Sequence, residues 1–261
     1  MLKAILFDLD GVLYEGERPI PGAAEAVAWV RAQRIPHLFV SNTTSRPRAA
    51  LVEKLAKLGL EVRVDEILTP PFVANRWLHA HVRGPVALYV REATRREFSD
   101  IEIASDNAAQ VSAVVLGDMG EQWDFHRLNT AFRQLIQPPA PVLVALGMTR
   151  YWRAEDGLNL DVAPFVTALS CATGVEPVVL GKPARSFFAA ALEILKVTAA
   201  ETIMIGDDIR SDVAGAQAAG LRALMVRTGK FTPDDLHHGI TPDAILDSVR
   251  GLPAWWREHA Q

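Results

Sequence analysis

Residues 3–11 read KAILFDLDG, and this stretch decides the fold. Its first five residues form a short apolar run that two aspartates and Gly11 bring to an end. A short apolar run with such an end is typical of a strand buried inside a sheet. We therefore expect the chain to begin with a buried strand that carries carboxylates, Asp8 and Asp10, at its carboxyl end.

The same alternation of strand and helix continues along the chain. Runs rich in β-branched and other apolar residues indicate strands, and patterns with apolar residues on one face indicate helices. Strands that alternate with helices predict a parallel sheet with helices on both faces. Beyond the first strand, we expect strands at 37–40, 178–180, 202–205 and 221–226, and helices at 23–33, 47–58, 70–79, 184–195 and 208–219.

The middle of the chain, about 80–178, has its own series of strand-like and helical segments. It contains three further strand-like runs, at 86–90, 113–116 and 142–146, and a helical segment at 125–136. With 261 residues, the chain is longer than a typical single domain. The middle segment either continues the first sheet or forms a separate α/β module inserted into it.

Composition excludes some classes of protein. The net charge of −4 argues against a general affinity for nucleic acid or anionic membranes. No apolar run approaches the ~20 residues of a membrane span, and Asp8 cuts short the first apolar run, so no signal peptide is expected. The single cysteine, Cys171, fits a reducing compartment and is expected as a small buried side chain of a helix. These features predict a soluble, cytoplasmic protein.

Polar side chains gather where four of the expected strands end. Each alone has an ordinary explanation, such as a helix cap or a solvated surface charge. In parallel sheets, however, ligands bind at the carboxyl ends of the strands, so the coincidence indicates a site. The residues are Asp8 and Asp10 after the first strand, Ser41 and Asn42 after the second, Lys182 after 178–180, and Asp207 and Asp208 after 202–205, with Asp212 one helical turn further on.

The chemistry of these side chains suits a phosphate ester. Carboxylates around a water-filled gap favour Mg²⁺, which can offset the charge of the phosphate. Asp8 can then act as a nucleophile that forms an aspartyl-phosphate. Asp10 points the same way along an extended backbone and can protonate the leaving oxygen. Ser41 supplies a hydroxyl group, and Lys182 supplies a positive charge for nucleophile and phosphate.

Four segments resemble, in order, the four motifs of the haloacid-dehalogenase superfamily of phosphatases. They are DLDGVL at 8–13, SNT at 41–43, GKP at 181–183 and GDDIRSD at 206–212. The resemblance implies a Rossmann-like core in which Asp8 is the nucleophile and Asp10 the acid and base.

The resemblance also implies a set of ligands. Mg²⁺ would be held by Asp8, the backbone carbonyl of Asp10 and Asp207. Asp208 and Asp212 would contact the ion through water or support its direct ligands. The phosphoryl group would be bound by Ser41, Asn42, Thr43 and Lys182.

The middle of the chain resembles the large α/β cap of the branch with NagD-like nucleotide phosphatases and pyridoxal phosphate phosphatases. Segments 147–174, 204–208 and 227–230 are similar to the subgroup of the phospholysine phosphohistidine inorganic pyrophosphate phosphatase. We therefore expect a catalytic core formed by 1–79 and 179–261, and an inserted cap at 80–178. In the cap, Arg150, Tyr151, Trp152 and Arg153 are candidate contacts of the substrate. Caps of this branch often mediate dimers, so a homodimer through the cap is a further expectation.

Together these features predict Mg²⁺-dependent hydrolysis of a small phosphorylated metabolite, either a phosphomonoester, a phosphoramidate or pyrophosphate. A mutase or phosphotransferase would carry the same motifs, and a non-catalytic metabolite-binding protein can share the fold. A dehalogenase needs neither Mg²⁺ nor a second aspartate, and the presence of Asp10 and Asp207 argues against it. The chain has no G-x-G-x-x-G after a strand and no P-loop motif, so dinucleotide and P-loop chemistry are unsupported.

Overall fold

The first strand, β1 (Ala4–Asp8), lies inside a six-stranded parallel sheet in the computed structural model, which describes residues 1–106, 108–154 and 157–260. All five of its residues are buried, which explains why the run is apolar up to Asp8. β1 pairs with β12 on one side and with β4 on the other, and both pairings are parallel. The predicted parallel α/β core of the Rossmann-like type is therefore confirmed.

The order of strands in this sheet is β14-β13-β12-β1-β4-β5. Two of these strands, β5 and β14, were not expected from the sequence and are only two and three residues long. The strands are β1 (Ala4–Asp8), β4 (His37–Val40), β5 (Ile67–Leu68), β12 (Thr202–Gly206), β13 (Arg222–Val226) and β14 (Ala244–Leu246).

Helices cover both faces of the six-stranded sheet. Ile5 and Phe7 of β1 belong to a buried cluster with residues of α1, α2 and α9. On the other face, α7 packs against α8 and buries Phe187 and Phe188 completely. The helices are α1 (Ala23–Ala32), α2 (Arg48–Lys57), α7 (Arg185–Leu195), α8 (Gly215–Ala218) and α9 (Leu252–His259), with the short η1 (Val64–Glu66), η4 (Ala199–Glu201), η6 (Pro233–His237) and η7 (Val249–Gly251) between them.

Two short elements near the carboxyl edge of this sheet bear on the site. A hairpin of β2 (Tyr14–Glu15) and β3 (Arg18–Pro19) follows β1. The predicted helix at 208–219 is a π-helical turn, η5 (Ile209–Ala214), continued by α8. The predicted position of this helix is correct, but its first six residues are π-helical rather than α-helical.

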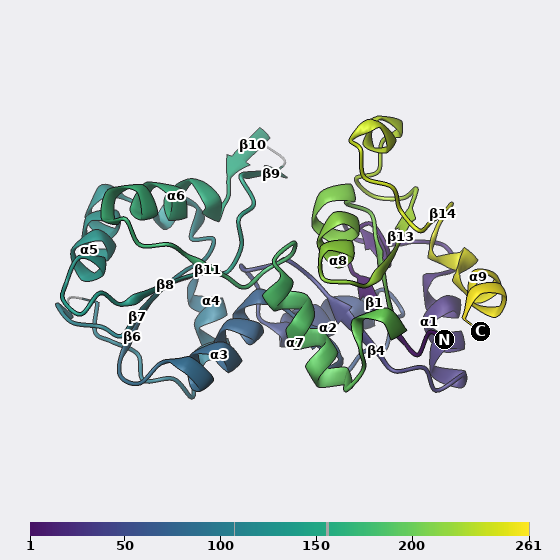
Figure 1. Cartoon of the computed structure of the whole chain (residues 1–261), viewed down its shortest axis with the longest axis horizontal. Helices are drawn as coiled ribbons and strands as arrows, with labels where there is room; N and C mark the ends of the chain where they lie inside the picture. Colours follow the sequence, from purple (N-terminus) through teal and green to yellow (C-terminus); the bar gives the residue numbers. More distant parts are fainter. Residues whose placement is uncertain (107, 155–156, 261) are drawn as a thin grey trace. The chain divides into compact units, whose positions relative to one another are not determined.

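A second parallel sheet has the order β11-β8-β7-β6. Figure 1 shows α5 and α6 on one side of it and α3 on the other. Val114 and Leu116 of β7 face α5 and α6 in a separate buried cluster. The elements are β6 (Val86–Tyr89), β7 (Ala113–Leu116), β8 (Val142–Ala145), β11 (Val178–Val179), α3 (Pro70–His81), α4 (Glu92–Arg95), η2 (Arg96–Phe98), η3 (Gly120–Gln122), α5 (Phe125–Leu135) and α6 (Val162–Thr173), with a separate hairpin of β9 (Tyr151–Ala154) and β10 (Gly157–Leu160).

Contacts divide the chain into two units. The first unit comprises 1–41, 48–68 and 182–261, and the second comprises 42–47 and 69–181. The helix α3 thus lies with the second unit, whereas the sequence placed residues 70–79 with the core. Hydrogen bonds explain why 42–47 joins the second unit: the Thr44 carbonyl accepts one from Thr94 Oγ1 (2.7 Å), and Thr44 Oγ1 accepts one from the Asp118 amide (3.2 Å).

One expected strand belongs to the other sheet. Residues 178–180 were assigned to the core sheet, but β11 (Val178–Val179) pairs with β8 in the second unit. Lys182 therefore does not follow a strand of the six-stranded sheet. A short apolar run has the same composition in either sheet, so the sequence could not decide between them. Cys171 is a second correction, because its side chain is exposed on α6.

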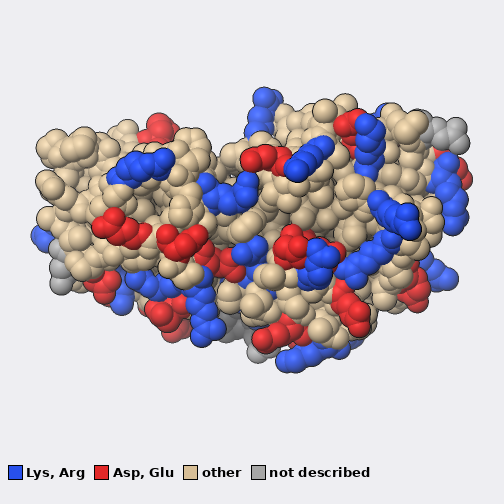
Figure 2. Space-filling view, turned by 90° about the horizontal axis from the view of Figure 1, so that it is seen from below, with Lys and Arg blue, Asp and Glu red and all other residues tan. Residues whose placement is uncertain are grey.

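The surface carries both signs of charge. Figure 2 shows basic and acidic side chains interspersed on the face that it draws, as expected for 27 basic and 31 acidic residues. Among the helices of the described residues, none is long and apolar enough to cross a membrane.

Candidate active site

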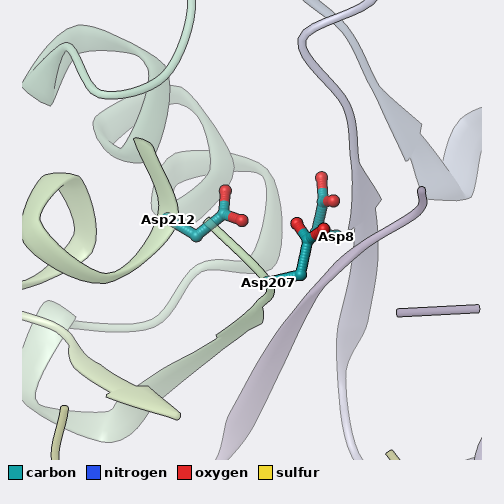
Figure 3. Close-up of side chains that lie close together, drawn as sticks. All are labelled: Asp8, Asp207 and Asp212. Atoms are coloured by element: carbon teal, nitrogen blue, oxygen red, sulfur yellow. The ribbon is translucent and has the colours of Figure 1, made fainter. Parts of the chain in front are cut away.

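Three carboxylates converge at the carboxyl edge of the six-stranded sheet. Asp8 is the last residue of β1, Asp207 follows the neighbouring β12, and Asp212 lies in η5. Each offers an oxygen within 4.8 Å of those of the other two, and all three residues are buried. Figure 3 shows Asp8 and Asp207 side by side, with the Asp212 carboxylate directed toward them. The strand register brings these residues together from opposite ends of the chain.

The ammonium group of Lys182 lies between two of these carboxylates. Its Nζ donates hydrogen bonds to Asp8 Oδ1 (2.5 Å) and Asp212 Oδ1 (2.7 Å), and the residue is only 3% exposed. Burial alone would lower the pKa of Lys182, but Asp212 and Asp8 raise it above the ordinary value. Lys182 is therefore a permanent buried cation beside Asp8.

One lysine does not neutralise this many carboxylates. Burial raises the pKa of Asp8 to about 7, and Lys182 only partly opposes it. Burial, together with Asp8 and Asp212, raises the pKa of Asp207 to about 8. Both pKa values thus lie far above the ordinary range, because burial disfavours the charged form and neighbouring carboxylates repel it. A bound cation would offset this repulsion.

Asp208 and Asp212 are joined by a hydrogen bond, and Asp208 also caps the π-helical turn. Asp208 caps the turn, because its Oδ1 accepts hydrogen bonds from the Arg210 and Ser211 amides (both 3.0 Å). The Asp208 amide in turn donates to Asp212 Oδ2 (3.2 Å). Both oxygens of Asp212 thus have protein partners, Lys182 and the Asp208 amide. Asp212 is positioned to orient Lys182.

Asp10 follows β1 on an exposed turn of the same edge. Desolvation by the surrounding protein raises the pKa of its carboxyl group, while Lys54 and Lys230 oppose this rise. A raised pKa is what a carboxyl group needs in order to donate a proton near neutral pH. The next residue, Gly11, has φ +84°, and a Cβ there would lie 2.0 Å from Asp207 Oδ2. Glycine is required at this position because the turn passes directly over Asp207.

The predicted phosphate-binding residues divide between the two units. Ser41 directly follows β4, the neighbour of β1, and its amide donates to the Leu68 carbonyl (3.0 Å). Asn42 and Thr43 belong to the segment grouped with the second unit. In that unit Tyr151 and Trp152 are 50% and 42% exposed, whereas the side chain of Arg153 lies outside the described residues.

Three residues at the site were not predicted from strand ends. Thr228, Gly229 and Lys230 follow β13, and the Lys230 amide donates to Asp207 Oδ2 (2.7 Å). The Lys230 ammonium lies 3.5 Å from Asp208 Oδ2. Polar residues that follow an apolar strand indicated the other site residues, and the same pattern is present at 228–230. This segment was nevertheless identified from the sequence only by its similarity to the phosphatase subgroup.

The residues fit a divalent cation. Oδ1 of Asp207 is buried and accepts no hydrogen bond from any described residue, whereas Oδ2 has its partner in the Lys230 amide. A buried carboxylate oxygen without a partner is costly unless a cation or water meets it. Oxygen ligands from carboxylates are those that Mg²⁺ prefers.

Comparison with known proteins identifies the class. Residues 5–104 match the model of the haloacid dehalogenase-like hydrolases, and 179–252 match a second model described as haloacid-dehalogenase-hydrolase-like. A human relative is 38% identical over 264 residues, which cover 99% of this chain and 96% of the relative. The chain therefore belongs to the haloacid dehalogenase-like hydrolases, and the predicted enzyme class, a phosphatase of this family, is confirmed.

The human relative is the phospholysine phosphohistidine inorganic pyrophosphate phosphatase. Among solved structures, a p-nitrophenyl phosphatase from Archaeoglobus fulgidus has a TM-score of 0.89 and 29% identity, and covers 97% of this chain and 99% of its own. NagD from E. coli has a TM-score of 0.85 over 95% and 97% of the two chains. Its 22% identity shows the shared fold alone.

Proposed function

We propose that this protein is a Mg²⁺-dependent phosphatase that forms an aspartyl-phosphate on Asp8. The observation that carries the proposal is the buried arrangement of Asp8 between Lys182 and Asp207, with one Asp207 oxygen lacking a protein partner. Mg²⁺ would be held by Asp8, Asp207 and the backbone carbonyl of Asp10. It would offset the negative charge of the phosphate oxygens, so that the anionic Asp8 could approach the phosphorus atom.

In the first step, a carboxylate oxygen of Asp8 attacks phosphorus, and the bond from phosphorus to the leaving group breaks. Asp10 donates its proton to the leaving atom, which the raised pKa of Asp10 supports. Lys182 holds the orientation of Asp8 and offsets negative charge that develops on the phosphoryl oxygens. The products of this step are the free leaving group and a phosphorylated Asp8.

In the second step, water attacks phosphorus of the aspartyl-phosphate while Asp10 takes up a proton from it. The bond between phosphorus and Asp8 breaks, inorganic phosphate leaves, and Asp8 returns as a carboxylate. Asp212 keeps Lys182 in place throughout, because its Oδ1 accepts a hydrogen bond from Nζ (2.7 Å). Ser41, Asn42 and Thr43 are proposed to bind the phosphoryl oxygens.

We infer a small phosphorylated metabolite as the substrate: a phosphomonoester, a phosphoramidate or pyrophosphate. The relatives are named as phosphatases of phospholysine, phosphohistidine, inorganic pyrophosphate and p-nitrophenyl phosphate, and these names support this range. The second unit is proposed to act as the cap that selects among these substrates, and to form a dimer contact. Cys171 as the single cysteine supports a cytoplasmic location.

The test is hydrolysis of p-nitrophenyl phosphate with Mg²⁺ and with a chelator. Activity is expected only with the metal, and Asp8→Asn should abolish it while the circular dichroism spectrum stays unchanged. The matched control is Asp247→Asn, which changes an exposed aspartate paired with Arg227. A phosphoryl label that hydroxylamine removes should appear on the wild type but not on Asp8→Asn. Full activity of Asp8→Asn would refute the mechanism, and transfer of the label to an added alcohol rather than water would indicate a phosphotransferase.

A further inference from the structure

Three hydrogen bonds hold the turn that follows β13 against the site. Thr228 Oγ1 donates to the Gly11 carbonyl (2.5 Å), and the Gly229 amide donates to Glu15 Oε1 (2.6 Å). The Lys230 amide donates to Asp207 Oδ2 (2.7 Å). Thr228–Lys230, which we call the Asp207 turn, thus joins the motif after β1 to the carboxylate after β12.

The Asp207 turn determines which oxygen of the carboxylate is occupied. Oδ2 accepts the Lys230 amide, whereas Oδ1 is buried and has no donor among the described residues. Asp207 is 1% exposed, so water at the surface does not compensate for the missing donor. The turn therefore holds one oxygen with a backbone hydrogen bond and leaves the other for a cation.

Close packing prevents the carboxylate from moving. A Cβ at Gly229, where φ is +68°, would lie 2.1 Å from Asp207 Oδ2 and 2.5 Å from the Cα of Gly11. A Cβ at Gly11 would approach the same oxygen to 2.0 Å. Asp207 Oδ2 thus lies between two glycine backbones, and any side chain at either position would displace it.

We propose that the Asp207 turn is a positioning element of the metal site, with Thr228 and Glu15 as its positioning residues. This inference rests on the proposed function, in which Asp207 binds Mg²⁺. In the proposed mechanism neither Thr228 nor Glu15 binds the phosphate or the metal; their hydrogen bonds go to the Gly11 carbonyl and the Gly229 amide. They hold the turn, and the turn holds Asp207 in the orientation that a metal ligand requires. Groups that orient metal ligands change metal affinity when they are removed, by about 10- to 100-fold.

The experiment measures Mn²⁺ and Mg²⁺ binding to the metal-free full-length protein, without substrate, by electron paramagnetic resonance and calorimetry. Thr228→Val removes the hydroxyl donor and is expected to weaken binding about 10-fold or more, whereas Thr228→Ser keeps the donor and should bind like the wild type. Arg227→Ala is the matched control in the same segment, because its side chain pairs with the exposed Asp247.

Glu15 needs a comparison of two variants, since it also carries a charge near the site. Glu15→Gln and Glu15→Ala both remove the charge, but only Glu15→Ala removes the acceptor of the Gly229 amide. Weaker metal binding is therefore expected for Glu15→Ala relative to Glu15→Gln. At saturating Mg²⁺, Thr228→Val should recover most of kcat, because the machinery that acts on phosphate is intact. Glu15→Ala should then have the same kcat as Glu15→Gln, since both remove the same charge near Asp10.

The outcomes separate the inference from the proposed function. If the wild type binds neither ion, the metal-dependent function itself fails. If the wild type binds and folded Thr228→Val and Glu15→Ala bind equally well, the positioning role is overturned while the function stands. Should Thr228→Val fail to fold, the two Glu15 variants decide, because Glu15 is exposed and its replacement leaves the core unchanged.

Discussion

At the scale of single residues, the behaviour of Lys182 depends on its burial. A surface ion pair contributes about 0–1 kcal/mol, because water and salt screen it. Lys182 has no such screening, and its removal would leave the buried Asp8 and Asp212 carboxyl groups without the cation that pairs with both. The same residue therefore serves stability and the reaction, and the two effects can be measured separately.

Lys182→Met is expected to lower kcat about 100-fold or more, since it removes a preorganised charge beside the nucleophile. It should also destabilise the protein by about 3–5 kcal/mol, since two buried carboxyl groups lose their cationic partner. Kinetics with p-nitrophenyl phosphate and urea unfolding measure the two effects. The control is Lys3→Met, which breaks an exposed pair with Glu201 and should leave stability and kcat close to those of the wild type. Equal losses in both variants would contradict the buried role.

At the scale of elements, the junction of β12 and η5 depends on the absence of a side chain. A Cβ at Gly206 would lie 2.2 Å from the Cβ of Asp212. Gly206→Ala is therefore expected to displace Asp212 and with it Lys182, lowering both kcat and stability, the latter by about 1–3 kcal/mol. Gly59→Ala is the comparison: its φ of +79° strains an alanine by about 1–2 kcal/mol, but open space surrounds it and kcat should stay unchanged. Thermal unfolding and kcat measured on both variants give the test.

A second element, the hairpin of β9 and β10, exposes large apolar side chains. Tyr151 and Leu160 stand opposite each other in its register and are 50% and 60% exposed. Their exposure makes the hairpin a candidate for contact with the substrate. Tyr151→Ala and Trp152→Ala are expected to change the ratio of kcat/KM between pyrophosphate and phosphoamino acids several-fold, while turnover of p-nitrophenyl phosphate stays close to that of the wild type. Unchanged ratios in both variants would show that the hairpin does not contribute to substrate selection.

Sequence patterns were sufficient for elements that are long or directly adjoin an apolar strand. Asp8 and Asp207 could be placed because each follows a buried run, and the strand register then brings them together. The position of Lys182 could not be derived this way, because the run before it pairs in the other sheet. The contact between Gly229 and Glu15 joins residues 214 positions apart. Only the folded structure shows such a contact, since neither residue type nor spacing specifies it.

At the scale of the whole molecule, folding buries carboxyl groups whose ionisation costs free energy, first through desolvation and then through repulsion between them. The pKa values of Asp8 and Asp207 are raised from 3.8 to about 7 and about 8. A carboxyl group with a raised pKa in the folded state stabilises the fold fully below pH 3.8, and this contribution is lost as the pH rises through the folded-state value. The metal-free protein should therefore lose stability between about pH 4 and pH 8. Because Mg²⁺ binds the ionised carboxylates, it should restore more stability as the pH rises.

Thermal unfolding at pH 5.5, 7.0 and 8.5, with Mg²⁺ and with a chelator, is the corresponding measurement. The difference in Tm between the two conditions is expected to grow with pH, by about 2–4 °C for each kcal/mol of restored stability. Asp207→Asn supplies the control, because it removes one of the charges that repel each other. It should be more stable than the wild type at pH 8.5 without metal and gain little from Mg²⁺. A Mg²⁺ effect that is independent of pH, or one that persists in Asp207→Asn, would show that the ion stabilises the protein elsewhere.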